Sequence, residues 1–208
     1  MRSLRPGRAE YTLAGYGSMI ADTVRMDAYR SALAACIKPG DVVLDLGAGT
    51  GIMALPACQL GAARVYAIEP SDACAVGIEL ARRNGFADRI EFIQSASFAF
   101  RPRRKADVMV SDLRGVMPLH GLHIASIVDA RTRLLARGAA QIPQRDRIFG
   151  QLVADPALYD EELRVWRQGS FGLDLTPALR WAAHAWRKVK LAPERLLGEP
   201  SALFELDY

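Results

Sequence analysis

Val42-Val43-Leu44-Asp45-Leu46-Gly47-Ala48-Gly49-Thr50-Gly51 is the stretch of sequence that decides the fold. Apolar β-forming residues on both sides of Asp45 are typical of a strand buried on both faces. The glycines that follow allow the backbone to turn sharply and to approach a ligand closely. Ile52 stands where the dinucleotide fingerprint G-x-G-x-x-G has its third glycine. The pattern therefore predicts a nucleotide-like cofactor and favours S-adenosylmethionine over NAD.

A carboxylate after the next predicted strand supports this choice. Val65-Tyr66-Ala67-Ile68 ends in Glu69, eighteen residues after Gly51, which is the spacing of one βαβ unit. From the carboxyl end of a parallel strand, Glu69 can accept hydrogen bonds from both hydroxyls of a ribose. Asp45 would otherwise be a costly carboxylate inside an apolar strand. The glycine loop and this acid resemble the first motifs of class I S-adenosylmethionine-dependent methyltransferases.

Strands and helices alternate along the chain up to residue 142. Helices are predicted at residues 24–37, 50–60, 71–84 and 124–137, and strands at 42–46, 65–68, 90–93 and 107–111. Helix 50–60 is expected to start at Thr50 and to be kinked by Pro56. This alternation predicts an α/β fold with a doubly wound, mostly parallel sheet, whose ligands bind beyond the carboxyl ends of the strands. The residues expected to contact the cofactor at this edge are Asp45, Gly47, Ala48, Gly49, Gly51, Glu69, Pro70 and Ser97.

The pattern changes beyond Pro143, where a soft domain boundary is predicted. Residues 147–153 are expected to form a strand, residues 156–166 a helix, and residues 175–186 an irregular apolar stretch. We therefore predict an S-adenosylmethionine-binding domain over residues 1–142. Residues 143–208 are expected to form a partial β-barrel region with a helical dimerisation arm at about 156–186.

Composition limits the classes of function. The chain has 208 residues, half of them hydrophobic, with a formal net charge of +4, so it can bury a sizeable core. The one dense basic run, Arg-Pro-Arg-Arg-Lys at residues 101–105, lacks interleaved aromatic residues. It is typical of a solvated loop, and a nucleic-acid partner is not expected.

Cysteine usage and the absence of long apolar segments predict a cytoplasmic protein. Cys36, Cys58 and Cys74 lie far apart in apolar helical contexts, which is typical of reduced core residues and offers no metal-binding pair. The basic N-terminus runs into no apolar segment typical of a secretion signal. No stretch reaches the ~20 apolar residues that a membrane span requires. We expect neither a membrane partner nor a bound metal.

A narrower resemblance follows from motifs on both sides of the glycine loop. Met19-Ile20-x-Asp22-x-Val24-Arg25-x-x-x-Tyr29-Arg30, Ser111-Asp112-x-x-Gly115 and Asp129-Ala130-Arg131 resemble the protein arginine methyltransferases and their bacterial relatives. The resemblance implies that Met19 lies over the cofactor, that Arg25 pairs with its methionine carboxylate, and that Asp112 acts on the acceptor. Phe171-Gly172-Leu173-Asp174 is similar to a segment of the arm through which those enzymes dimerise.

The sequence departs from that family at the acceptor site. The family has a second glutamate nine residues after the position of Asp112, and Gly121 stands there. A guanidinium stays cationic, so desolvating it beside a single short carboxylate is costly. His120 and His123 flank this glycine, and an imidazole can take a proton from a phenol, hydroxyl or amine. We therefore predict methyl transfer to an N or O nucleophile of an unidentified acceptor, with Asp112 and His123 as catalytic residues.

Three alternatives remain open at this point. The first is an arginine N-methyltransferase, and the second is a cofactor-binding but inactive dimerisation module. The third is an NAD oxidoreductase, which Ile52 disfavours. In each methyltransferase reading a homodimer is expected, because a small second region with several large aromatic residues is hard to bury alone. These residues are Tyr159, Trp166, Phe171, Trp181 and Trp186. The chain also stops where the resembled family continues its C-terminal β-barrel.

Overall fold

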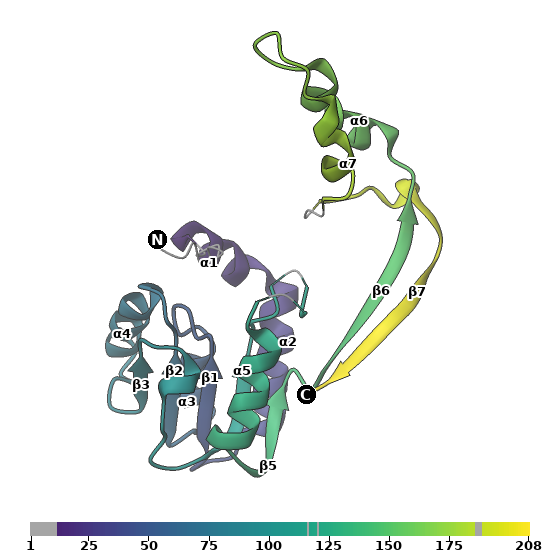
Figure 1. Cartoon of the computed structure of the whole chain (residues 1–208). Coiled ribbons are helices and arrows are strands. Elements are labelled where there is room, and N and C mark those ends of the chain that lie inside the picture. The colour runs from purple at the N-terminus through teal and green to yellow at the C-terminus, as the bar shows by residue number, and fades with distance from the viewer. Residues whose placement is uncertain (1–11, 116, 120, 186–188) are drawn as a thin grey trace. The chain divides into compact units, whose positions relative to one another are not determined.

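The computed structural model describes residues 12–115, 117–119, 121–185 and 189–208. Its centre is a parallel sheet in the order β3-β2-β1-β4-β5 (Figure 1). The strands are β1 (Val42–Leu46), β2 (Arg64–Ile68), β3 (Ile90–Ile93), β4 (Ala106–Ser111) and β5 (Leu135–Ile142). The chain runs outward from β1 to β3 and then returns to place β4 on the other side of β1. This confirms the predicted doubly wound sheet and puts a topological switch point between β1 and β4.

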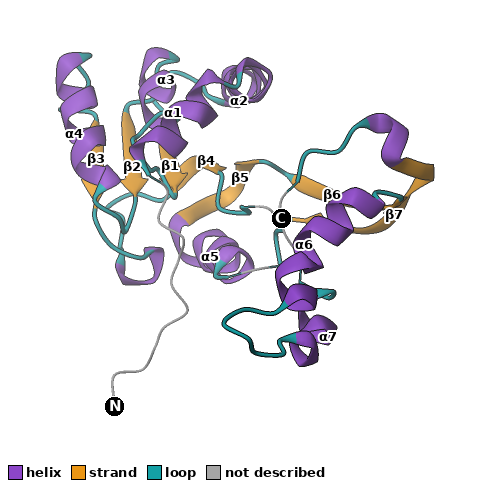
Figure 2. Cartoon of the chain, turned by 90° about the horizontal axis from the view of Figure 1, so that it is seen from above, coloured by secondary structure: helices purple, strands orange, loops and turns teal. Residues whose placement is uncertain are grey.

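Helices cover both faces of this sheet (Figure 2). One face carries α2 (Thr23–Cys36), α3 (Ala54–Gln59) and α4 (Ala73–Arg83). The other carries α5 (His123–Asp129), which continues into the π-helical turn η2 (Ala130–Leu134). Because strand side chains alternate, Val43 packs into the first layer and Leu44 into the second. Two apolar layers therefore hold the strands, as the mostly apolar sequence of β1 indicates.

The helix after the glycine loop begins later than predicted. Its first residue is Ala54, the preceding residue Met53 is the N-cap, and Thr50 caps nothing. Pro56 therefore occupies the third helical position, where a backbone amide has no intrahelical acceptor to lose. This position explains how a proline is accommodated in so short a helix. The loop of residues 47–53 consists mostly of turns, and the Gly51 amide donates to the Ala48 carbonyl at 2.7 Å.

A further helix, α1 (Leu13–Ala21), precedes α2. Its N-cap Thr12 accepts a hydrogen bond from the Gly15 amide at 3.1 Å, and Asp22 caps α2 by accepting one from the Arg25 amide at 3.1 Å. No residue of α1 is fully buried. None of the described helices combines the length and apolar character needed to cross a membrane.

The chain divides into two compact units. The first comprises residues up to Asp146 together with Asp207–Tyr208, and the second is Arg147–Leu206. The second contains most of β6 (Arg145–Val153) and β7 (Leu196–Asp207), which form an antiparallel pair, with α6 (Pro156–Gln168) and α7 (Leu179–Ala182) between them (Figure 1). Short 3-10 turns lie at Thr176–Ala178 and Pro193–Arg195. The predicted boundary at Pro143 lies just ahead of this division, and Trp186 lies outside the described residues.

Candidate cofactor and acceptor site

Three strands of the sheet end at the same level. Leu46 pairs with Ile68 of β2 on one side and with Ser111 of β4 on the other. The residues that follow, Gly47, Glu69 and Asp112, are consequently neighbours along one edge of the sheet. This is the edge at which ligands bind in open parallel sheets.

The glycine loop is held close to the protein by contacts that only glycine permits. Gly47 and Gly49 have φ angles of 79° and 54°, in the left-handed region. A Cβ on Gly49 would lie 2.4 Å from the Tyr16 ring, and one on Gly47 would lie 2.1 Å from Leu113 Cδ2. The amides of Gly47 and Ala48 both donate to the Ile68 carbonyl at 2.9 Å. Tyr16 and Leu113 therefore border this loop, although the sequence pattern singled out neither.

Glu69 ties the glycine loop to the second strand. Its Oε2 accepts a hydrogen bond from the Gly49 amide at 3.0 Å, and its Oε1 accepts one from the Ser71 amide at 2.8 Å. The side chain is buried, while the next residue, Pro70, is exposed. Each carboxylate oxygen has capacity for a second donor, so the fixed carboxylate can still accept two hydroxyls.

Asp45 is a buried acid with an unused oxygen. It lies within β1 on the face of Val43, and its Oδ2 has no hydrogen-bond partner among the described residues. The pKa of Asp45 is raised to about 7, mainly because the carboxyl is buried. The hydrogen bond from the Ala54 amide lowers this pKa, and the nearby Glu69 carboxylate raises it further. Thr50 Oγ1 is likewise buried without a partner in the described chain. Both atoms lie at the glycine loop, where a polar ligand would satisfy them.

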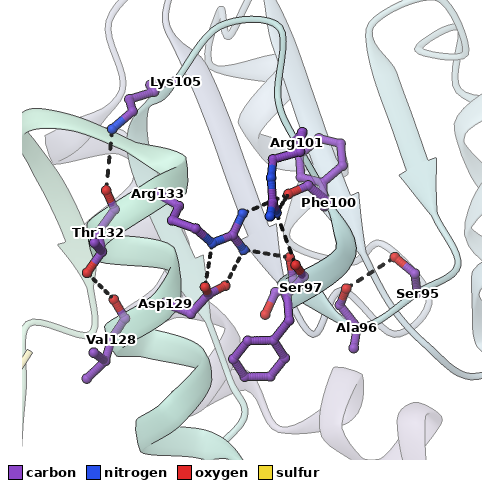
Figure 3. Close-up of polar contacts among 11 residues, drawn as sticks. Ser95, Ala96, Ser97, Phe100, Arg101, Lys105, Val128, Asp129, Thr132 and Arg133 are labelled. Carbon is purple, nitrogen blue, oxygen red and sulfur yellow. Dashed lines mark hydrogen bonds and ion pairs between the residues drawn. The ribbon is translucent and has the colours of Figure 1, made fainter.

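Ser97 lies on the 3-10 turn η1 (Ser97–Ala99), which follows β3. Its hydroxyl is buried and is not hydrogen-bonded to any described group. Figure 3 shows how Arg133 holds this turn: its guanidinium donates to the Ser97 carbonyl at 3.0 Å and to the Phe100 carbonyl at 2.9 Å. Asp129 fixes that guanidinium through two hydrogen bonds of 2.5 Å. The turn is thus anchored to α5 and η2, with the hydroxyl left available.

Asp112 lies between two guanidinium groups. Arg25 of α2 forms an ion pair with its Oδ2, and Arg114 Nε lies 3.9 Å from its Oδ1. Met19 of α1 is half-buried, and Gly121 is exposed on the loop after β4. The structure therefore brings Arg25 and Asp112 together, as expected for one site, but it makes them partners of each other.

His123 is buried. Its ring contacts Tyr208, and Tyr208 is in turn hydrogen-bonded to Asp146. Tyr208 donates its hydroxyl proton to Asp146 Oδ2 at 2.6 Å, so His123 Nε2 donates to the Tyr208 oxygen at 2.9 Å. His123 Nδ1 has no described partner. Burial lowers the pKa of His123, although the nearby Asp146 carboxylate acts in the opposite direction. Its role in proton transfer stays a prediction, and His120 lies outside the described residues.

Several residues at this site could not have been found from local sequence. They belong to no motif with a characteristic spacing: Tyr16, Arg114, Asp146, Tyr208 and Arg133. Most of their contacts join residues more than thirty positions apart in the sequence, as in the Arg114–Asp146 and Arg133–Ser97 pairs. Asp146 stands between Arg145 and Arg147 in the sequence, a pattern that does not point to a site residue. Among the described residues there is no cluster of three or more His, Cys, Asp or Glu side chains that could hold a metal ion.

Comparisons with known proteins find methyltransferases. A family model described as ribosomal protein L11 methyltransferase (PrmA) matches residues 28–132, about half of the chain. Protein arginine N-methyltransferase 6 of Danio rerio is 33% identical over 198 residues, covering 91% of this chain and 56% of that protein.

Two solved structures share the fold. A Trypanosoma brucei protein arginine methyltransferase 1 enzyme–prozyme heterotetramer with S-adenosylhomocysteine has a TM-score of 0.83 at 22% identity, covering 92% of this chain and 61% of that one. Arabidopsis thaliana protein arginine methyltransferase 10 has a TM-score of 0.77 at 25% identity, covering 95% and 63%. This chain spans about half the length of the curated relatives it matches.

Proposed function

The chain belongs to the class I S-adenosylmethionine-dependent methyltransferases, and we propose that it transfers a methyl group from S-adenosylmethionine to an N or O nucleophile. One observation carries this proposal. The edge of the sheet combines a tight glycine loop, a fixed carboxylate at Glu69, and buried polar atoms without partners at Asp45, Thr50 and Ser97. These groups fit a ligand with an ammonium, a ribose and a base. An NAD oxidoreductase has no comparable support.

The order of the strands suggests how the cofactor lies. The glycine loop after β1 holds the aminoacyl part, Glu69 after β2 holds the ribose, and Ser97 after β3 reaches the base. Arg25 pairs with Asp112 and would exchange that partner for the methionine carboxylate of the cofactor. Met19 and Tyr16 of α1 cover the cofactor from the side of the glycine loop.

The residues of the chain position the acceptor, since the cofactor supplies an activated methyl group on a sulfonium. Asp112 follows β4, next to β1 at the switch point, so it lies at the same edge of the sheet as the glycine loop. Once Arg25 has left Asp112, the Asp112 carboxylate can orient the acceptor or take a proton from it. His123 is too deeply buried to reach an acceptor without movement of α5, so Asp112 is the stronger candidate for this role.

Calorimetry with S-adenosylhomocysteine tests the cofactor site. Glu69→Ala should weaken binding by roughly 2 to 4 kcal/mol, because two hydroxyls lose hydrogen bonds to a charged group. Glu79→Ala is the matched control, since Glu79 is an exposed glutamate on α4 whose partner is Arg82. Equal affinity of the wild type and Glu69→Ala would remove the ribose assignment.

Arginine N-methylation is the second candidate function. The observation in its favour is the 33% identity to a protein arginine N-methyltransferase along most of this chain. Methyl transfer to an arginine-containing peptide would support it. An inactive module that only binds the cofactor would instead bind S-adenosylhomocysteine and methylate no acceptor.

We also propose that the chain forms a homodimer through its second unit. Leu163 is the one buried hydrophobic residue among those described there, whereas Phe171 is 98% exposed and Trp181 61%. Exposed apolar groups of this size are typical of an interface. Light scattering at micromolar concentration should give twice the monomer mass, and Trp181→Glu should shift it toward the monomer while Trp181→Phe does not. A monomeric wild type would contradict the proposal.

A cytoplasmic location is proposed on the cysteines. Cys36, Cys58 and Cys74 are free thiols, and the last two are buried. Thiols persist in a reducing compartment. Fractionation of cells that produce the protein would test this location, and recovery in a secreted fraction would refute it.

A further inference from the structure

Arg114 places a second cation beside Asp112, where the acceptor is proposed to bind. It lies two residues after Asp112, and its side chain is 30% exposed. Its Nε faces Asp112 at 3.9 Å, its Nη1 forms an ion pair with Asp146, and its Nη2 donates to the Tyr29 hydroxyl at 2.9 Å. The guanidinium therefore spans two carboxylates instead of extending into solvent.

This position is held from three directions. Tyr29 of α2 accepts from Arg114 and donates to the Ser111 carbonyl at 3.3 Å, which fixes it at the end of β4. Asp146 is buried and also accepts the Tyr208 hydroxyl at 2.6 Å. A buried carboxylate that lost its guanidinium would be left uncompensated, which is strongly destabilising. Arg114 is thus a built part of the site.

The ion pairs of this region disfavour a cationic acceptor. Asp112 and Asp146 are matched by Arg25 and Arg114 in the free protein. If the methionine carboxylate took Arg25, Asp112 would be free to offset the sulfonium, while Arg114 would remain paired with Asp146. A guanidinium or ammonium acceptor would then add a positive charge beside Arg114, and Asp112 would have to offset this charge and the sulfonium together. A carboxylate acceptor would meet Asp112 as a like charge.

We infer that Arg114 determines acceptor specificity and that the acceptor is an uncharged hydroxyl of a phenol or an alcohol. The inference rests on the proposed methyl transfer and narrows its substrate class. In the reaction the hydroxyl oxygen bonds to the methyl carbon as the carbon–sulfur bond breaks, and the sulfur keeps that electron pair. The hydroxyl proton passes to the Asp112 carboxylate. The products are a methyl ether and S-adenosylhomocysteine.

The first test uses the sulfonium as a probe of local charge, without turnover. S-adenosylmethionine and S-adenosylhomocysteine differ by one methyl group and one positive charge, and calorimetry gives the ratio of their affinities. Arg114→Met should raise the affinity for S-adenosylmethionine relative to S-adenosylhomocysteine about tenfold, because a nearby cation is removed. Arg82→Met, at an exposed ion pair on α4, should leave the ratio unchanged. An unchanged ratio in Arg114→Met would overturn the inference.

A second variant guards against misfolding. Arg114→Gln combined with Asp146→Asn avoids a lone buried carboxylate and should move the ratio in the same direction by a smaller factor. If the wild type binds neither cofactor form, the proposed function fails. If both forms bind and the ratio stays the same in both variants, only the assignment of Arg114 fails.

The second test identifies the acceptor class with labelled S-adenosylmethionine. Two peptides that differ only in a central tyrosine or arginine are compared, and p-cresol represents a small-molecule phenol. The wild type should methylate a hydroxyl probe at least tenfold faster than the arginine peptide, and Arg114→Met should narrow that preference tenfold. The peptide and p-cresol arms separate a protein acceptor from a small one. Preference for arginine, or no transfer to either hydroxyl probe by cofactor-bound protein, refutes the inference.

Discussion

Replacing Asp45 by asparagine should remove a large part of the pH dependence of stability. Burial raises the pKa of this carboxyl from 3.8 to about 7 in the folded protein. The folded protein therefore keeps a proton on Asp45 at pH values where the unfolded chain has lost it. Since the folded pKa is the higher one, the associated stability is present below pH 3.8 and is lost as the pH rises through about 7.

The size of the effect follows from this shift. A shift of about three pH units corresponds to roughly 4 kcal/mol in the free energy of unfolding, at about 1.4 kcal/mol per unit. Asparagine cannot ionise, and its Oδ1 can still accept the hydrogen bond from the Ala54 amide. It adds a buried NH2 group, which costs about 1 to 3 kcal/mol if it finds no acceptor, but that cost does not depend on pH.

Urea unfolding at pH 5, 6, 7 and 8 measures the prediction. The free energy of unfolding of Asp45→Asn minus that of the wild type should rise by about 1.4 kcal/mol per pH unit between pH 5 and 6.5 and level off above pH 8. Asp88→Asn, at an exposed loop position, is the matched control and should show no such rise. A difference that is constant from pH 5 to pH 8 would refute the reasoning that Asp45 is a destabilised buried acid.

Three further changes probe the site and the core. Arg133→Met should weaken S-adenosylhomocysteine binding about tenfold in calorimetry, because the turn that carries Ser97 loses its anchor; unchanged binding would contradict that role. Gly49→Ala should abolish measurable cofactor binding, whereas Gly85→Ala, also at positive φ but with nothing within 4 Å, should lower stability and keep binding; equal effects would remove the close-approach argument. Leu33 is fully buried, so Leu33→Ala should lower the free energy of unfolding by about 2 to 5 kcal/mol in urea unfolding. A smaller loss would mean that neighbouring side chains fill the space left by the removed atoms.

Much of the fold was predictable because its signals are local. A mostly apolar strand, a glycine loop and an acid one βαβ unit later indicate a parallel sheet, which places Gly47, Glu69 and Asp112 at one edge. The start of α3 was not predictable, since Thr50 is a good N-cap in isolation. In the folded chain Thr50 lies in the loop at the sheet edge, and the helix begins at Ala54, which is fully buried.

The sequence by itself determined the fold class and which residues follow the strands at one edge of the sheet, because both depend on periodicity and on spacing within single βαβ units. Only the tertiary structure decided the charges around the acceptor position. Arg114 meets Asp146 and Tyr29, His123 meets Tyr208, and Tyr16 covers Gly49. Such contacts join residues far apart in the chain, which leave no period in the sequence and become neighbours only when the sheet and its helices are packed.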